Sequence, residues 1–201
     1  MTQPPMSKTP SSTLTRTALI AAPLAIVAYG VTRSLGKMDG HYGPGFDWQL
    51  AHIFALAGMV LFLPVVLLMR RLAKPGLARE CVTGVTLAGL GAAIVQFGAD
   101  IVQAFLAEDQ ADLKRLQHEF MDLPGVELAF YQVGPQLFFL GLVVLAAFLA
   151  VARRVPAWSP VLILAGVLLV PVNLTFIIGT GLLMLVALLP LARAAGTPAR
   201  A

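Results

Sequence analysis

Apolar residues occur in long runs along this chain, and short polar segments separate the runs. The runs at residues 15–34, 48–72, 80–107 and 127–153 are each long enough to cross a bilayer as a helix, which takes roughly 20 residues. A further apolar block, residues 157–193, would be about 55 Å long as one helix, nearly twice the hydrocarbon thickness. Pro171 and Asn173 favour a turn inside that block. The pattern predicts an all-α, polytopic membrane bundle of six transmembrane helices, ending in two shorter crossings.

One polar segment has a helical pattern of its own. Between Glu108 and Met121, Leu113, Leu116 and Phe120 recur at helical spacing with charged residues between them. This predicts an amphipathic helix on the outer surface, between the third and fourth crossings. The sequence predicts three regions: a disordered tail rich in Pro, Ser and Thr at residues 1–13, one transmembrane domain at residues 14–194, and a C-terminal tail at residues 195–201.

Composition supports the membrane assignment. Hydrophobic residues make up 58% of the chain and charged residues only 12%, and the mean hydropathy is +0.85. The net charge of +4 could suggest a nucleic-acid partner, but Lys and Arg cluster at helix ends rather than along one exposed face. We therefore predict the lipid bilayer as a partner and no nucleic acid.

The positions of the basic residues predict the topology. With the N-terminus inside, the inner segments hold Lys8, Arg16, Arg70, Arg71, Lys74, Arg79, Arg153, Arg154, Arg193 and Arg200. The outer loops hold only Arg33, Lys37, Lys114 and Arg115. Six crossings with both termini in the cytoplasm satisfy the positive-inside rule. The alternative, in which residues 157–193 cross only once, would place Arg193 and Arg200 outside.

The most distinctive polar residues lie on the third crossing. Gln96, Asp100 and Gln103 fall within about a 60° arc of that helix, so they share one stripe. An ionisable residue at the centre of a membrane helix costs roughly 2.5–3.5 kcal/mol on insertion scales. We therefore expect Asp100 to be sheltered from lipid by neighbouring polar groups. Gly84, Ala88 and Gly91, on an adjacent face, predict a ridge where another helix packs closely.

Other crossings place polar groups at a similar depth in the outer half of the bundle. Pro135 removes a backbone donor there and predicts a kink in the fourth crossing. Asp39, His41 and Asp47 of the first outer loop have no recognised metal-ligand spacing, and Cys81 is the only cysteine, so we predict no metal site. The predicted ligand-binding residues are His52, Gln96, Asp100, Gln103, Tyr131, Gln132, Gln136 and Asn173.

Three functions fit this constellation. The first is binding of a small molecule or ion in an outward-facing pocket, as a transporter component, sensor or accessory subunit. The second is an intramembrane enzyme acting on a lipid-like substrate, with Asp100 and His52 as the candidate catalytic acid–base pair, although no known catalytic motif occurs. The third is a structural subunit in which polar groups hold the helices together. The sequence identifies no cofactor, and a homo-oligomer or a larger membrane complex is a possible assembly.

Two segments resemble a known group of proteins. His52-Ile-Phe-Ala-Leu-Ala-Gly58, followed by Leu63-Pro64 and Arg70-Arg71, resembles the second helix of small multi-helix actinobacterial membrane proteins of unknown function. The segment from Gly134-Pro135-Gln136 to Gly141 is similar to their fourth helix. The resemblance implies a multi-pass protein of the bacterial cytoplasmic membrane, and it implies no functional residues.

Overall fold

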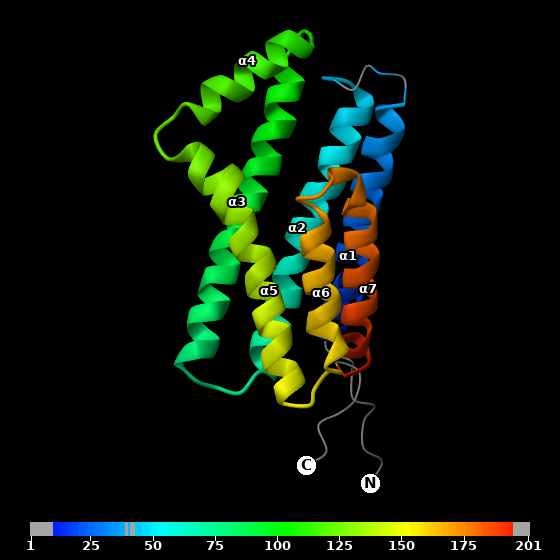
Figure 1. Ribbon diagram of the computed structural model, residues 1–201, viewed down its shortest axis with the longest axis vertical. Coiled ribbons are helices and arrows are strands. Elements are labelled where there is room, and N and C mark those ends of the chain that lie inside the picture. Colours follow the sequence, from blue (N-terminus) through cyan, green and yellow to red (C-terminus); the bar gives the residue numbers. More distant parts are fainter. Residues whose placement is uncertain (1–9, 39, 41–42, 195–201) are drawn as a thin grey trace.

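The structure is a computed structural model that describes residues 10–38, 40 and 43–194 (Figure 1). Its elements are α1 (Pro10–Gly36), α2 (Phe46–Leu72), α3 (Leu77–Leu106), α4 (Gln110–Met121), η1 (Glu127–Val133), α5 (Gly134–Val151), α6 (Trp158–Leu169), η2 (Leu174–Phe176) and α7 (Ile177–Ala194). No strand occurs among these residues, so the all-α class is confirmed. Residues 10–13 belong to α1, and the rest of the predicted N-terminal tail and residues 195–201 lie outside the described part of the chain.

The long helices run roughly parallel and antiparallel to one another (Figure 1). α1 packs against α2 and α7, α3 packs against α2 and α5, and α6 lies against α5 and α7. Within the described residues, five helices are long and apolar enough to cross a membrane, and α6 is a shorter apolar helix. The outer end of the bundle is defined here as the end that carries α4.

The last two helices form a hairpin that is shorter than the rest of the bundle. α6 has 12 residues and is therefore about 18 Å long. The turn after it lies below the outer ends of α1, α2 and α3 (Figure 1). The predicted turn at residues 171–173 is confirmed, because the Asn173 side chain accepts a hydrogen bond of 2.8 Å from the backbone N–H of Thr175 and begins η2.

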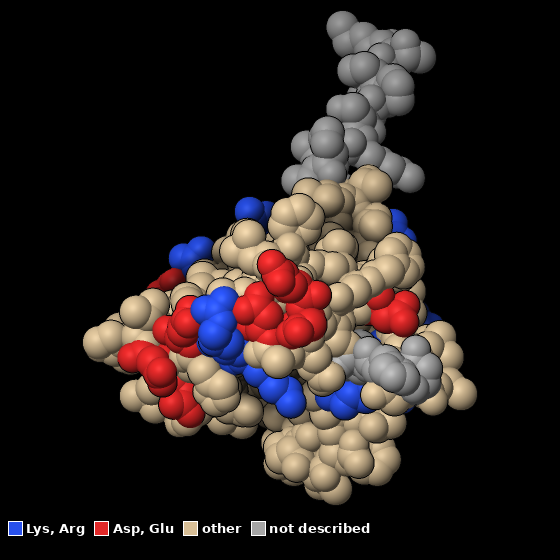
Figure 2. Space-filling view, turned by 90° about the horizontal axis from the view of Figure 1, so that it is seen from above, with Lys and Arg blue, Asp and Glu red and all other residues tan. Residues whose placement is uncertain are grey.

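The predicted amphipathic helix is also confirmed. α4 begins at Gln110 because the side chain of Asp109 caps it, accepting a hydrogen bond of 2.8 Å from the backbone N–H of Asp112. Arg115 donates to Asp112 and Glu119 at 2.6 Å each, and the bond from Arg115 lowers the pKa of Asp112. Leu113 is buried on the opposite side of the helix. Acidic and basic side chains gather over this end of the molecule (Figure 2).

Close packing of α3 against α5 depends on a glycine that the sequence analysis did not select. A Cβ atom at Gly89 would lie 2.3 Å from the backbone N of Phe138 and 2.5 Å from the O of Gly134. The predicted ridge is wrong, because Ala88 is exposed and a Cβ at Gly84 or Gly91 would meet nothing within 4 Å. Another helix does pack closely on α3, but the contacting face is the one that carries Gly89.

Replacing Gly89 tests this contact. We expect Gly89→Ala to destabilise the protein by about 1–3 kcal/mol, because the added methyl group overlaps backbone atoms that cannot rotate away. The matched control, Gly91→Ala on the same helix, has open space and a better helix former, so its stability should be unchanged or slightly higher. Unfolding in a detergent mixture measures both variants, and equal stabilities would contradict the assigned packing face.

Candidate functional site

Asp100 lies on the inward face of α3, about 9 Å from the outer end of the helix. Only 6% of the residue is exposed. Its Oδ1 accepts a hydrogen bond of 3.0 Å from the hydroxyl group of Tyr131, which lies on η1. The carboxyl group is thus sheltered by neighbouring side chains and bonded to the next long apolar segment, as a carboxyl group in apolar surroundings requires.

A π-helical segment positions Tyr131. Residues 127–133 form the π-helix η1, and the backbone N–H of Gly134 bonds to the O of Ala129, five residues earlier. Pro135 follows directly and has no N–H to donate to the preceding turn. The regular α-helix α5 therefore begins at this point, with Gly134 and Pro135 in its first turn. Gly134 is also necessary, because a Cβ there would lie 2.2 Å from the O of Ala129 and 2.3 Å from the Cβ of Ala92. The kink predicted at Pro135 therefore takes the form of a π segment, a feature often found at functional sites.

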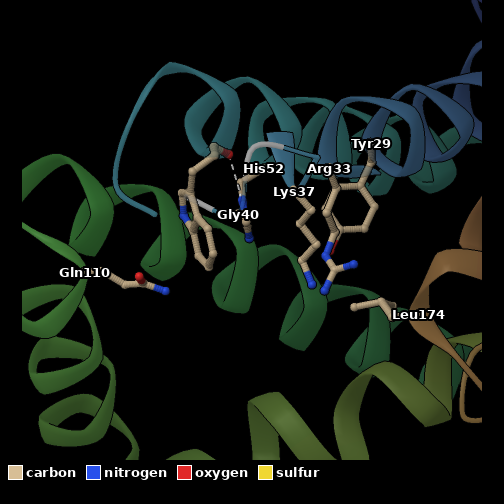
Figure 3. Close-up of a pocket in the computed structure, with 8 residues that line it drawn as sticks. Tyr29, Arg33, Lys37, Gly40, His52, Gln110 and Leu174 are labelled. Atoms are coloured by element: carbon tan, nitrogen blue, oxygen red, sulfur yellow. Dashed lines mark hydrogen bonds between the residues drawn. The ribbon is translucent and has the colours of Figure 1, made fainter. Parts of the chain in front are cut away.

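His52 belongs to a cluster of aromatic side chains at the outer end of α2. Its Nδ1 donates a hydrogen bond of 2.8 Å to the backbone O of Trp48. The Trp48 ring stacks on the imidazole at a centroid distance of 4.3 Å. Tyr29 from α1 approaches edge-on at 5.9 Å, and Phe97 from α3 lies at 6.1 Å. The free edge of the imidazole points into a cavity (Figure 3).

This outer cavity has a volume of about 540 Å³. It is lined by Tyr29, Arg33, Lys37, Gly40, Trp48, His52, Gln110 and Leu174. The first three of these are spaced four residues apart, so they follow one face of α1 and its extension. Leu174 comes from the low turn between α6 and α7, so the short hairpin leaves the space that forms the cavity (Figure 3).

Tyr29 connects the outer cavity to the part of α3 that carries Asp100. Tyr29 lines the cavity, is itself 7% exposed, and meets Phe97 of α3 edge-on at a centroid distance of 5.9 Å. Gln49 holds the beginning of α2 against the same part of α3, because its Nε2 donates to the O of Ile101 at 3.1 Å. Asp100, which bonds to Tyr131, lies between Phe97 and Ile101 on this stretch of α3.

The other predicted site residues are distributed over several places. Gln103 is buried and lines a separate cavity of about 560 Å³ under α4, and Gln96 is half-buried on α3. Gln132 is exposed and donates to Glu127, also on η1, at 2.8 Å. Gln136 is exposed and borders a space of only about 30 Å³. Asn173 caps η2.

Asp100 and His52 were predicted to form a pair, but they have different hydrogen-bond partners in the structure. Of the hydrogen bonds in the described part of the chain, that of Asp100 goes to Tyr131 and that of His52 goes to Trp48. The His52 ring lies against Tyr29 and Phe97, and Phe97 precedes Asp100 by about one turn of α3. Within the described ranges, no group of three His, Cys, Asp or Glu side chains could hold a metal ion. Asp39 and His41 lie outside those ranges.

Sequence reasoning missed the two cations of the outer cavity. Arg33 and Lys37 were treated as charges of an outer loop. Two signals in the sequence were available: the spacing from Tyr29 to Arg33 to Lys37 places them on one helical face, and both are exceptions to the preference of basic residues for the inner side. Basic residues that depart from that preference are reasonable candidates for a functional role.

Comparison with known protein families, with curated proteins and with solved structures gives no match to this chain. The chemistry of the site therefore has to follow from its own geometry. Hydrogen-bond donors, cationic groups and aromatic faces converge on one cavity of a size typical for small-molecule sites. Such a cavity can bind a small polar molecule.

The bond between Asp100 and Tyr131 can be tested with a double-mutant cycle of Asp100→Asn and Tyr131→Phe. We expect the two changes to be non-additive by about 0.5–2 kcal/mol, the range found for hydrogen bonds between membrane helices. Unfolding free energies in a detergent mixture provide the measurement. Gln132→Ala, a change at the exposed neighbour of Tyr131, serves as control and should be additive with Asp100→Asn. Full additivity in the first cycle would show that the bond contributes nothing.

Proposed function

We propose that the chain is a multi-pass protein of the bacterial cytoplasmic membrane, with six crossings and both termini in the cytoplasm. In this arrangement the shorter apolar helix α6 makes the fifth crossing, and α7 makes the sixth. α1 begins and α7 ends at the same end of the bundle, opposite α4 (Figure 1). That end also carries most of the described basic residues: Arg16, Arg70, Arg71, Lys74, Arg79, Arg153, Arg154 and Arg193. The positive-inside rule supports a cytoplasmic position for it.

We further propose that the outer cavity binds a small polar molecule or ion, and that the protein acts as a transporter component, sensor or accessory subunit. One observation carries this proposal: a cavity of about 540 Å³ in which Tyr29, Arg33, Lys37, Trp48 and His52 converge from two helices. Polar and charged side chains at membrane depth are costly to keep and generally serve a function. A position at the outer end would make this cavity accessible from outside the cell.

A structural subunit is the second candidate, and a specific contact favours it. The hydrogen bond from Tyr131 to Asp100 joins η1 to α3, as polar groups do when they hold membrane helices together. This role would also leave room for a homo-oligomer or a larger complex. The enzyme alternative has less support, because Asp100 and His52 bond to different partners rather than to each other.

The proposed topology can be tested with the native cysteine. Cys81 is exposed near the inner end of α3, so a membrane-impermeant maleimide added to intact cells should leave it unmodified. In the Cys81→Ser background, Lys114→Cys on α4 should be modified rapidly under the same conditions. Permeabilised cells, in which Cys81 becomes reactive, provide the control. Labelling of Cys81 in intact cells would reverse the proposed orientation.

Binding in the outer cavity can be followed through Trp48. The chain has two tryptophans, so Trp158→Phe leaves Trp48 as the only source of tryptophan emission. We expect at least one compound in a panel of small polar metabolites to change this emission and to raise the unfolding temperature of the protein in nanodiscs. His52→Leu should abolish both effects, whereas Gln132→Leu, on the exposed side of η1, should keep them. Effects that persist in His52→Leu would place the binding site elsewhere.

A further inference from the structure

A second large concave site lies at the end of the bundle opposite α4, where the loop between α2 and α3 meets the end of α5 (Figure 1). It has a volume of about 580 Å³. The loop and the start of α3 contribute Lys74 and Arg79, and the end of α5 contributes Phe148, Val151 and Ala152. We call this site the inner groove. It shares no lining residue with the outer cavity, so the two sites are independent of each other.

The part of the inner groove that comes from α5 is apolar. Val151 and Ala152 follow Phe148 by three and four residues, so the three side chains lie on one face of the helix end. Val151 is 86% exposed, and Leu77 at the start of α3 is 80% exposed. Apolar surface that the rest of the chain leaves uncovered, at the end of long apolar helices, is suited to contact with acyl chains.

The part of the inner groove that comes from the loop and α3 is cationic. The side chain of Arg79 is only 17% exposed, and its Nη1 donates to the backbone O of Arg70 at 3.5 Å and to that of Ala73 at 3.4 Å. Lys74 lies in the loop itself and is exposed. Its amine has no ion pair or hydrogen bond within the part of the chain that the structure describes. The groove therefore has one fixed cation and one that can reach a ligand.

Positive charge is in excess around the inner groove. Residues 70–80 contain four basic residues and one acidic residue, Glu80. Arg70 donates to Oε2 of Glu80 at 2.8 Å and Arg79 donates to Oε1 at 2.9 Å, so both oxygens of this carboxylate already have cationic partners. The other described acidic residues lie in the half of the bundle that carries α4, and the two residues after Ala152 are also arginines. An anion at this site would meet little repulsion from the chain.

We propose that the inner groove binds an anionic phospholipid, with an acyl chain along Phe148 and Val151 and the phosphate group bound by Lys74. An apolar surface that borders an excess of positive charge matches a molecule whose apolar tail ends in a negative charge. Basic pockets between membrane helices bind the head groups of anionic lipids in this way. Lys74 suits this role because its amine is carried on a flexible apolar stem, which can follow a head group at the membrane surface.

The lipid preference of the purified protein can be measured by mass spectrometry of the intact protein with its bound lipids. The protein in detergent is titrated with dioleoyl phosphatidylglycerol and, separately, with the zwitterionic dioleoyl phosphatidylcholine. We expect the first phosphatidylglycerol to bind more tightly than the first phosphatidylcholine. Lys74→Gln should weaken phosphatidylglycerol binding by about fivefold, the contribution of one basic residue near an anionic head group, and leave phosphatidylcholine binding unchanged.

Arg16→Gln is the matched control for Lys74→Gln, because it removes one exposed cation from α1 at the same end of the bundle. It should leave the binding of both lipids unchanged. Equal binding of the two lipids to the unmodified protein would overturn the proposal. An equal loss of phosphatidylglycerol binding in Lys74→Gln and Arg16→Gln would also overturn it, because the preference would then come from the overall charge of this end and not from the groove.

A fluorescent label shows whether the bound lipid lies in the inner groove. In the Cys81→Ser background, Val151→Cys carries a bimane label in the groove, and Leu14→Cys, exposed near Arg16 on α1, carries the same label in a reference protein. Both proteins are placed in phosphatidylcholine nanodiscs with a small fraction of lipid that has a spin-labelled acyl chain and either a phosphatidylglycerol or a phosphatidylcholine head group. Both leaflets contain the same lipids, so the result does not depend on the orientation of the protein.

At Val151→Cys, spin-labelled phosphatidylglycerol should quench the bimane about threefold more than spin-labelled phosphatidylcholine, and Lys74→Gln should remove this difference. At Leu14→Cys the two lipids should quench equally. Equal quenching at Val151→Cys, or the same preference at Leu14→Cys, would contradict a lipid site in the groove.

Glycerol 1-phosphate, a phosphate without acyl chains, tests whether the apolar part of the lipid is needed. At millimolar concentration it should leave the quenching at Val151→Cys unchanged. Displacement of the spin-labelled lipid would show that the groove takes a soluble anion, which would overturn the lipid proposal. The outcome is separate from that of the outer cavity: if no compound changes the emission of Trp48 but the preference at Val151→Cys is found, the function proposed for the outer cavity fails and the inner groove remains a lipid site.

Discussion

The central physical constraint in this bundle is that a carboxyl group on a long apolar helix has to be kept away from apolar surroundings. Asp100 meets this constraint by facing inward and accepting a hydrogen bond from Tyr131. Tyr131 reaches it from a π-helical segment, and that segment depends on Gly134 and Pro135. The backbone irregularity at the outer end of the fourth apolar segment is therefore part of the arrangement that accommodates one acidic residue.

A second consequence follows from unequal helix lengths. The hairpin of α6 and α7 turns below the outer ends of α1, α2 and α3 (Figure 1), so α7 packs only against the deeper part of α1. Further out, Tyr29, Arg33 and His52 line the outer cavity on the side that the hairpin leaves open. A longer α6 would fill this space with apolar side chains. The short hairpin therefore leaves room for the cavity at the outer end.

How much of the structure the sequence predicted depends on whether a sequence signal reports on neighbouring residues or on contacts between helices. Hydropathy located the helices, and Pro171 with Asn173 located the turn, because these signals depend on residues near one another in the chain. Partners across helices depend on rotation and backbone detail, which hydropathy does not contain. The sequence therefore placed Tyr131 among several site residues without showing that it bonds to Asp100, and it did not show that the contact face of α3 carries Gly89.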